Sequence, residues 1–404
     1  MATQAFTPPA HVDPAIVRHC RLYDRTISYE HPHETIVPEL VAGPPIFYAD
    51  NIALDQPGWV VTRAEDIRRI YADNENFTKK GYSGFSALIG ESWDIIPSEL
   101  DPPEHHAYRS VVQPYYSPSR MMAMQPVVTQ RARDIIAGFR DRGHCEFIAD
   151  FALLFPISIF LDLIGLPQDQ LHQFVEWENG LIHGKTNDQR ASSLRAIKAL
   201  LIETIAERRR NPGEDLISHA LEQQVDGRPW TDQELFGYAF NLYLGGLDTM
   251  TANLGFHFHH LATHPEDQAR MRANDYNENV VAIEELLRAY AAVSNYRICA
   301  KRYELDGQVM MPGDYLVVSS ALAARDPELY ENPQEIRLDR RPSHVALGNG
   351  VHRCLGQHLA RRELQTAIEE FFRAIPTFTV EPGFKVPFYL SGVIHIDELP
   401  LRWG

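Results

Sequence analysis

The chain has 404 residues, with 38 lysines and arginines against 54 aspartates and glutamates, so its formal net charge is −16. So acidic a protein is not expected to bind nucleic acid through a general basic surface. Its four cysteines lie far apart without CxxC spacing, which argues against a disulfide framework and favours a reducing, cytoplasmic location.

No membrane association is expected from the apolar segments of the chain. The first fourteen residues lack the apolar region of a signal peptide. The longest apolar run, 151–167, is interrupted by Pro156 and Asp162 and is too short to span a bilayer. No linker or repeat divides the sequence, so we expect a single domain, 1–404.

The predicted elements make this domain mainly α with a smaller β region. The β-rich part falls at roughly 40–100 and includes the apolar run 58–62, and the remainder is helical. Apolar residues at i, i+3 and i+4 predict helices at about 121–140 and 192–210. A short β-rich segment, 303–318, contains turn residues at Gly307 and Pro312-Gly313.

The longest predicted helix begins at the capping box Thr231-Asp232-Gln233-Glu234 and ends at His264, before Pro265. At 1.5 Å per residue such a helix would be about 50 Å long. It would cross the whole molecule.

The centre of this helix is unusual, because Gly245-Gly246 is followed by Leu247-Asp248-Thr249. Each interior glycine costs about 1 kcal/mol relative to alanine, and a charged Asp248 in an apolar helix adds a desolvation cost. One interpretation is a notch that faces a ligand, with Asp248 and Thr249 moving protons. The other is a close helix crossing at the glycines with a capped or ion-paired Asp248.

A second motif, Glu284-Glu285-Leu286-Leu287-Arg288, places Glu285 and Arg288 on one helix face at i, i+3. This spacing predicts an ion pair. Most such pairs are exposed and contribute little, so the motif is weak evidence on its own.

Cys354 is the most informative cysteine, since Gly348, Gly350 and Gly356 surround it and a helical pattern follows directly. Glycines let the backbone approach a flat ligand closely, and a helix N-terminus favours a thiolate. With His352 and Arg353 beside it, the cysteine is interpreted as a metal-bound thiolate, most simply on haem iron.

Two alternatives to this interpretation remain open. A lone cysteine is often only a small buried hydrophobic residue. A zinc site could use His352, Cys354 and His358, but it lacks a convincing fourth ligand.

Taken in order, these motifs and Asp101-Pro102-Pro103-Glu104-His105 resemble the cytochrome P-450 superfamily of haem-thiolate monooxygenases over nearly the whole chain. The chain is most similar to the soluble bacterial camphor hydroxylase group. This similarity rests on 245–249, 284–288, the run 357–363 and Ser391-Gly392-Val393. The resemblance implies the P-450 fold, with a long central helix over a haem.

The resemblance also implies roles for individual residues. Cys354 would be the axial ligand of the iron in haem b, with the amides of Leu355 and Gly356 bonded to its sulfur and Gly348 in the same loop. Asp248 and Thr249 would relay protons to dioxygen. The side chains expected to bind the haem propionates are His105, Arg109, Arg297 and His352.

Three positions depart from the family pattern. Leu347 stands where the haem loop usually has Phe, and Asn295 stands where the camphor group has an acidic residue. Trp93 replaces a Tyr that holds the substrate ketone, and it offers a donor but no acceptor. We therefore expect an apolar pocket for a terpenoid or norisoprenoid rather than camphor, lined by Phe85, Trp93, Leu244, Gly245, Val293 and Ile394.

The chain shows no cysteine cluster for an iron–sulfur centre and no GxGxxG motif after a strand, so its electrons must come from other proteins. A 2Fe–2S ferredoxin, supplied by NAD(P)H through a ferredoxin reductase, is the expected donor. It would dock on basic residues at Arg69, Lys79, Arg109 and Arg341. The competing hypotheses are a haem-thiolate enzyme that uses peroxide and a noncatalytic haem-thiolate sensor.

Overall fold

The computed structural model describes residues 6–23 and 27–404 and confirms a mainly helical fold with a smaller β region. The chain forms two compact units, each assembled from several segments. The first unit comprises Met1–Lys79, Gly255–Cys354 and Pro382–Leu399, and the second comprises Lys80–Leu254, Leu355–Glu381 and Pro400–Gly404.

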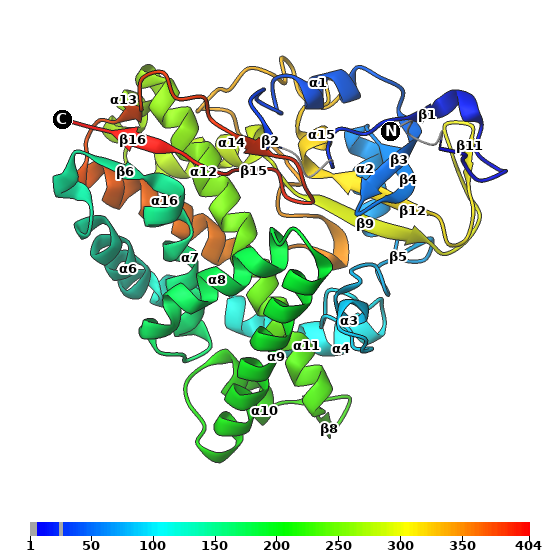
Figure 1. The fold of residues 1–404 in the computed structure, drawn as a ribbon, viewed down its shortest axis with the longest axis horizontal. Coiled ribbons are helices and arrows are strands. Elements are labelled where there is room, and N and C mark those ends of the chain that lie inside the picture. The colour runs from blue at the N-terminus through cyan, green and yellow to red at the C-terminus, as the bar shows by residue number, and fades with distance from the viewer. Residues whose placement is uncertain (1–5, 24–26) are drawn as a thin grey trace. The chain divides into compact units, whose positions relative to one another are not determined.

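The first unit contains a six-stranded sheet in the order β1-β3-β4-β12-β9-β5. Its strands are β1 (Val17–Arg18), β3 (Ile46–Ala53), β4 (Gln56–Val61), β5 (Phe77–Thr78), β9 (Ser294–Cys299) and β12 (Tyr315–Ser319). β3 and β4 are antiparallel, and β12 joins them parallel to β4. Figure 1 shows the blue β3 and β4 beside the yellow β12 and β9, which come from a distant part of the chain.

The centre of this sheet explains why the run 58–62 is so apolar. Trp59, Val60 and Val61 of β4 are each 0% exposed and pair with β12 in the register Leu316 to Trp59. A strand covered on both faces has an almost continuous apolar sequence. The prediction of a strand here is confirmed.

Smaller β elements and further helices complete the first unit, which also contains the end of α12 (Asp248–Thr263). The hairpin β10 (Tyr303–Leu305) and β11 (Gln308–Met310) turns at Asp306 and Gly307, which have φ of 48° and 73°. This hairpin and β12 confirm the predicted β-rich segment. The remaining elements are β2 (Ile27–Ser28), β14 (Phe388–Tyr389) and β15 (His395–Ile396), α1 (Ile36–Val41), α2 (Ala64–Ala72), α13 (Pro265–Ala273), α14 (Tyr276–Ala289) and α15 (Ser320–Ala324), and the 3-10 turns η1 (Pro14–Ile16) and η6 (Gly350–His352).

The second unit is mostly helical. Its helices are α3 (Phe85–Leu88), α4 (Glu104–Val112), α5 (Pro118–Ala123), α6 (Gln125–Ala137), α7 (Leu154–Leu163), α8 (Leu171–Ile182), α9 (Asn187–Arg210), α10 (Leu216–Glu222), α11 (Asp232–Gly246) and α16 (Gln357–Ala374), and α12 (Asp248–Thr263) begins in it. Its strands are β6 (His144–Glu146), β13 (Thr379–Val380) and β16 (Pro400–Arg402), which form one sheet, and the pair β7 (Gln224–Val225) and β8 (Arg228–Pro229). Shorter turns are η2 (Gln113–Tyr116), η3 (Arg140–Arg142), η4 (Ile148–Ala152) and η5 (Gln168–Gln170).

Two predicted helices have different outcomes. The prediction for 192–210 is confirmed by α9, which starts a few residues earlier because the Thr186 hydroxyl accepts a hydrogen bond from the Gln189 amide at 3.2 Å. The prediction of one helix over 121–140 is wrong, because α5 and α6 meet at Met124. Pro126 stands in the first turn of α6, where a proline starts a helix well but interrupts one that is already running.

The long helix predicted from the capping box is also divided. The box itself is present, with Thr231 and Glu234 bonded to each other's backbone amides. α11 ends at Gly246 and α12 begins at Asp248, with Leu247 between them at φ −102° and ψ −73°. Glycine has a low helix propensity, so the interruption falls beside the two residues that favour a helix least.

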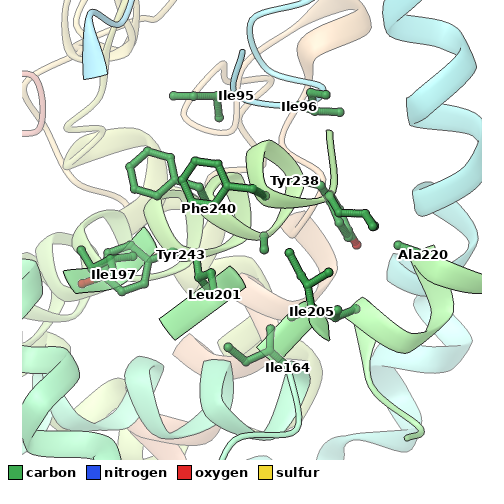
Figure 2. Close-up of a cluster of buried hydrophobic side chains, with 14 of the residues drawn as sticks. Ile95, Ile96, Ile164, Ile197, Leu201, Ile205, Ala220, Tyr238, Phe240 and Tyr243 are labelled. Carbon is green, nitrogen blue, oxygen red and sulfur yellow. The ribbon is translucent and has the colours of Figure 1, made fainter. Parts of the chain in front are cut away.

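The core of the second unit forms around α11. Figure 2 shows Tyr238, Phe240 and Tyr243 of this helix gathered with Ile197, Leu201 and Ile205 of α9 and other buried side chains. These aliphatic residues of α9 recur at i, i+4 and i+8, which places them on one face. In the residues that the structure describes, no helix is both long enough and apolar enough to cross a membrane.

Candidate active site

Cys354 lies at the end of a tightly folded loop in the first unit. Its amide donates to the Leu347 carbonyl at 2.9 Å, and the Gly348 amide donates to the Val345 carbonyl at 2.9 Å. The thiol is partly exposed, whereas Cys20, Cys145 and Cys299 are buried. The loop therefore presents one sulfur from an ordered backbone, directly before α16.

The glycines of this loop have different purposes. Gly348 and Gly350 have φ of +73° and +68°, the left-handed region that favours glycine. A Cβ on Gly350 would lie 2.6 Å from the Tyr71 carbonyl oxygen, so this glycine allows the loop to pack against α2 rather than against a ligand. A Cβ on Gly356 would meet nothing within 4 Å, so the space beside that residue is open.

The zinc alternative gains no support. In the described ranges, one group of side chains places three metal-binding atoms within 4.8 Å of one another, and it consists of Glu178, His183 and Asp248. It does not include Cys354.

Two side chains of β9, Arg297 and Asn295, contact Tyr71 of α2. Arg297 is 1% exposed, donates to the Tyr296 carbonyl at 2.8 Å, and has its guanidinium carbon 5.3 Å from the centre of the Tyr71 ring. Asn295, two residues earlier on β9, donates to the Tyr71 hydroxyl at 3.1 Å. His352 is partly buried in η6. The departure at Asn295 thus has a definite partner within this unit.

Two of the predicted pocket residues, Val293 and Ile394, belong to the first unit. Val293 is partly buried and forms an isolated β-bridge with Val393. Ile394 is 0% exposed, and its place in a substrate pocket stays a prediction. Its neighbour Val393 is partly exposed.

In the second unit, α4 carries two of the predicted haem-binding residues on one face. His105 and Arg109 are four positions apart on this helix. His105 is 1% exposed, and Arg109 is partly exposed with its Nε donating to Gln113 at 3.2 Å. A buried imidazole and a partly exposed guanidinium suit a ligand whose body is buried and whose polar groups lie at its edge, near solvent.

Gly245 and Gly246 border open space. A Cβ added to either would meet no atom within 4 Å, and Gly245 is exposed although Tyr243 and Leu247 beside it are buried. A close helix crossing is therefore not the reason for these glycines. The notch interpretation is the one that the geometry supports.

Thr249 faces the same turn of the helix. Its hydroxyl donates to the Gly245 carbonyl at 3.1 Å, which leaves lone pairs of the hydroxyl oxygen to accept a hydrogen bond. Thr251, two positions later, is 6% exposed, and its hydroxyl donates to the Leu247 carbonyl and to the Ala152 carbonyl, each at 3.1 Å. One threonine is thus placed to interact with a ligand and the other fixes the helix to its surroundings.

Aromatic side chains pack against one another at α11. Trp93 packs edge-on against Phe236 and Phe240, with ring centres 4.8 Å and 5.2 Å apart, and Phe85 packs against Phe240 at 5.6 Å. The indole N–H of Trp93 donates to Glu91 at 2.9 Å. Trp93 is 6% exposed within the core of the second unit and its donor is already engaged, so it offers no polar group to a substrate.

Leu244, Leu355 and Gly356 complete the predicted set. Leu244 and Leu355 are partly buried and pack against the apolar core of the second unit. Gly356 precedes the first turn of α16.

The sequence interpretation missed Glu178 and His183. Glu178 lies on α8 with Phe174 and Leu181, and all three are buried. This spacing of i, i+4 and i+7 marks one helix face, so a glutamate among apolar residues was the signal available in the sequence. Burial, and after it the charge of Asp248, raise the pKa of Glu178 well above its usual value.

The basic residues predicted to bind a ferredoxin differ in exposure. Arg69 and Arg341 are exposed, and Arg109 is partly exposed. Arg69 also pairs with Asp66 on its own helix at 3.3 Å, which offsets part of its charge. Lys79 is 5% exposed, so its assignment to a docking surface was wrong.

Comparison with known proteins identifies the family. The family model "Cytochrome P450" matches residues 168–277 and 280–390. "Probable cytochrome P450 127A1" of Sinorhizobium fredii is 36% identical over 98% of this chain and 97% of its own length. Crystal structures of CYP101J2 and CYP101C1 are 29% and 30% identical, each with a TM-score of 0.88, and cover 99% and 98% of this chain and all of their own.

The chain therefore belongs to the cytochrome P450 family and is a monooxygenase of that family. The family implies a haem, and the side chains of each unit fit one. The first unit supplies a partly exposed thiol and a buried guanidinium at Arg297. The second supplies a buried imidazole at His105 and a helix whose glycines leave room for a flat ligand.

Proposed function

We propose that this chain, acting as one domain over 1–404, hydroxylates a small apolar substrate of the terpenoid or norisoprenoid class. Dioxygen is the oxidant, and the electrons come from NAD(P)H through a ferredoxin reductase and a 2Fe–2S ferredoxin. The observation that carries the proposal is the open space at Gly245 and Gly246 beside Thr249 and Asp248. It supports a helix built to hold small molecules near a hydroxyl and a carboxylate.

Several residues of the chain are proposed to hold the haem. Cys354 is its proposed axial ligand, and the amides of Leu355 and Gly356 are proposed to bond to the sulfur. His105, Arg109, Arg297 and His352 are proposed to bind the propionate groups. When bound, the iron with its thiolate ligand supplies the cleavage of the bond between the two oxygen atoms.

The protein's own part in the chemistry is proton delivery and the exclusion of water. The Thr249 hydroxyl holds the Gly245 carbonyl and can accept a second hydrogen bond, so it can position a proton at the notch. Asp248, adjacent in the chain, is the proposed source of that proton. The neighbouring aromatic side chains keep bulk water from the same helix.

The proposed substrate is apolar because the available lining is apolar. Of the residues proposed to line the pocket, Phe85, Leu244, Val293 and Ile394 have hydrocarbon side chains, and Gly245 offers room. The engaged indole of Trp93 provides no hydrogen bond for a ketone. Shape and hydrophobic contact would therefore select the substrate, which suits a terpenoid or norisoprenoid of modest polarity.

The electron donor is proposed from charge. Arg69, Arg109 and Arg341 are accessible cations on a protein of net charge −16, so an acidic ferredoxin would approach them selectively. We place the reaction in the cytoplasm, where such soluble partners are found.

The axial ligand can be tested by replacing Cys354 with serine. We expect the variant to lose the thiolate-type absorption spectrum of the ferrous–carbon monoxide form, because a serine oxygen is a different donor. The control is Cys299→Ser, since Cys299 is buried and its thiol donates to the Lys301 carbonyl at 2.8 Å. If the spectrum persists without the Cys354 sulfur, the assignment is wrong.

The reaction can be tested with the protein reconstituted with a ferredoxin, its reductase and NADH. The substrate is chosen from terpenoids that shift the iron from low to high spin. In Thr249→Ala we expect product per NADH to fall about tenfold or more, with hydrogen peroxide formed instead, because a proton-positioning group is lost. Thr251→Ala is the matched control, since its hydroxyl bonds to Ala152.

The outcomes of this assay separate the competing functions. Unchanged coupling in Thr249→Ala would refute the proposed relay. Equal turnover with hydrogen peroxide and no ferredoxin would favour a peroxide-using enzyme, and no product under either condition would favour a sensor.

A further inference from the structure

Three ionisable side chains meet in the second unit where α8 ends and α12 begins. Glu178 is in the last turn of α8, His183 follows that helix, and Asp248 is the first residue of α12. One ligand atom from each lies within 4.8 Å of the other two. Of these three residues, only Asp248 has a role that the family resemblance implies.

Glu178 is the unusual member of this group. It is 2% exposed, and neither of its carboxyl oxygens has a hydrogen-bond partner among the described residues. It forms no ion pair with a lysine or arginine in the part of the chain that the structure describes. An ionised carboxylate in such surroundings is strongly disfavoured unless a charge or a proton compensates it.

The groups that face Glu178 make ionisation still less favourable. Asp248 approaches it from α12 with the same sign of charge, and Tyr243 approaches from α11 with its hydroxyl donating to the Phe174 carbonyl at 3.4 Å. Arg190 of α9 reaches the same helix, where its Nε donates to the Leu181 carbonyl at 3.1 Å. Two carboxyl groups this close favour a state with one proton between them.

We propose that Glu178 and Asp248 together carry one proton, and that the Glu178 side chain turns towards Asp248 and refills it with a proton after Asp248 has released its own. The O–H bond of Glu178 breaks and an O–H bond forms on Asp248. His183, which is partly exposed, then gives the proton of one ring nitrogen to Glu178 while its other ring nitrogen takes a proton from a hydronium ion of the solvent. The step involves no oxidation or reduction, and Glu178 is a positioning residue because it acts through Asp248.

The inference rests on the proposed proton role of Asp248, but the proton that the pair carries can itself be observed in the resting protein. In the haem-loaded protein at pH 7, infrared spectroscopy should show the carbonyl stretch of an un-ionised carboxylic acid that shifts in D₂O. Glu178→Gln should remove one such band, which the difference spectrum of wild type and variant separates from that of Glu363, a second carboxyl whose pKa burial raises to about 8. Glu176→Gln is the matched control and should keep it, because Glu176 lies on the same helix but is exposed.

The refilling step predicts a second result in the reconstituted reaction. Product per NADH in Glu178→Gln should fall by about tenfold at pH 8 and recover towards pH 6, because free protons then replace the missing donor. The Michaelis constant should not change. A merely structural role for Glu178 would give a loss that does not depend on pH.

Several outcomes would overturn the proposal. A wild-type protein without the infrared band, or a Glu178→Gln variant that keeps it, would show that the pair does not carry this proton. Normal coupling at pH 8 in Glu178→Gln would refute the refilling step. If the purified protein carries a zinc or manganese ion that Glu178→Gln loses, the three side chains form a metal site instead.

Failure of the underlying function gives a different pattern. Asp248→Asn would then leave product per NADH unchanged, while the infrared band of the wild-type protein would still disappear in Glu178→Gln. A thermal unfolding curve of each variant shows that the comparison is made between folded proteins.

Discussion

Replacing Glu285 with alanine is expected to lower the free energy of unfolding by about 3–5 kcal/mol, because it leaves a buried guanidinium without its carboxylate. Glu285 and Arg288 are both 0% exposed, and two hydrogen bonds of 2.8 Å join them. Glu285 also accepts from the Arg337 amide at 3.0 Å and lies 3.1 Å from Arg340. Its loss therefore affects a network rather than a single pair.

The measurement is equilibrium unfolding in urea, compared with a pair of the same spacing. Glu207 and Arg210 of α9 are also a Glu and an Arg at i, i+3, with oxygen and nitrogen 2.7 Å apart, but their side chains are 41% and 66% exposed. Glu207→Ala should have little effect, because water screens that pair. Equal effects of the two substitutions would show that burial does not determine the importance of Glu285.

Acid is expected to unfold the first unit at a higher pH than the one at which it unfolds most proteins, because the core of this unit contains several buried neutral histidines. Burial is the largest cause that lowers the pKa of each from 6.5, to about 2 for His31, about 3 for His33 and His257, and about 4 for His259. The rings of His31 and His33 lie against Phe256, at 5.7 Å and 4.8 Å. Arg325 is a nearby cation that opposes protonation of His31 and His33.

The sign of the effect follows from these shifts. The unfolded chain binds protons near pH 6.5 and the folded chain does not, so stability is complete above pH 6.5 and is lost as the pH falls towards 4. Each histidine contributes about 1.4 kcal/mol per pH unit, so four together cost roughly 8 kcal/mol between pH 6.5 and 5. A margin of about 5–15 kcal/mol would be largely consumed.

The test is the free energy of unfolding measured across this pH range. His31→Phe should reduce the slope by about one proton, because phenylalanine does not titrate and the site is already lined by Phe256 and Phe388. His172→Phe is the control, since His172 is exposed on α8. If the two variants have the same slope as the wild-type protein, the cluster does not govern acid stability.

Local spacing made part of the site predictable from sequence. The pair Glu285 and Arg288 and the capping box at Thr231 depend on residues three positions apart, so the sequence contains everything that forms them. The glycine pair was also recognisable as a weak point of its helix. Whether the space beside it was open or filled by another helix depended on distant residues.

The wrong and missing predictions share one cause. Lys79 was expected on the surface, and Glu178 was overlooked, because burial depends on which face of an element is covered. Periodicity gives the faces of a helix or strand but not what packs against them. The break at Leu247 likewise lies within a continuous helical pattern.

The glycines of α11 also bear on how this enzyme could be altered in the laboratory. Alanine at Gly245 or Gly246 would strengthen the helix by about 1 kcal/mol each, and no neighbouring atom would obstruct the added methyl group. The protein thus forgoes stability in order to keep a volume free. Gly350 allows no such change, because its φ of +68° and the Tyr71 carbonyl exclude a side chain. Libraries aimed at new substrates should therefore vary the helix that borders the open space and leave the cysteine loop untouched.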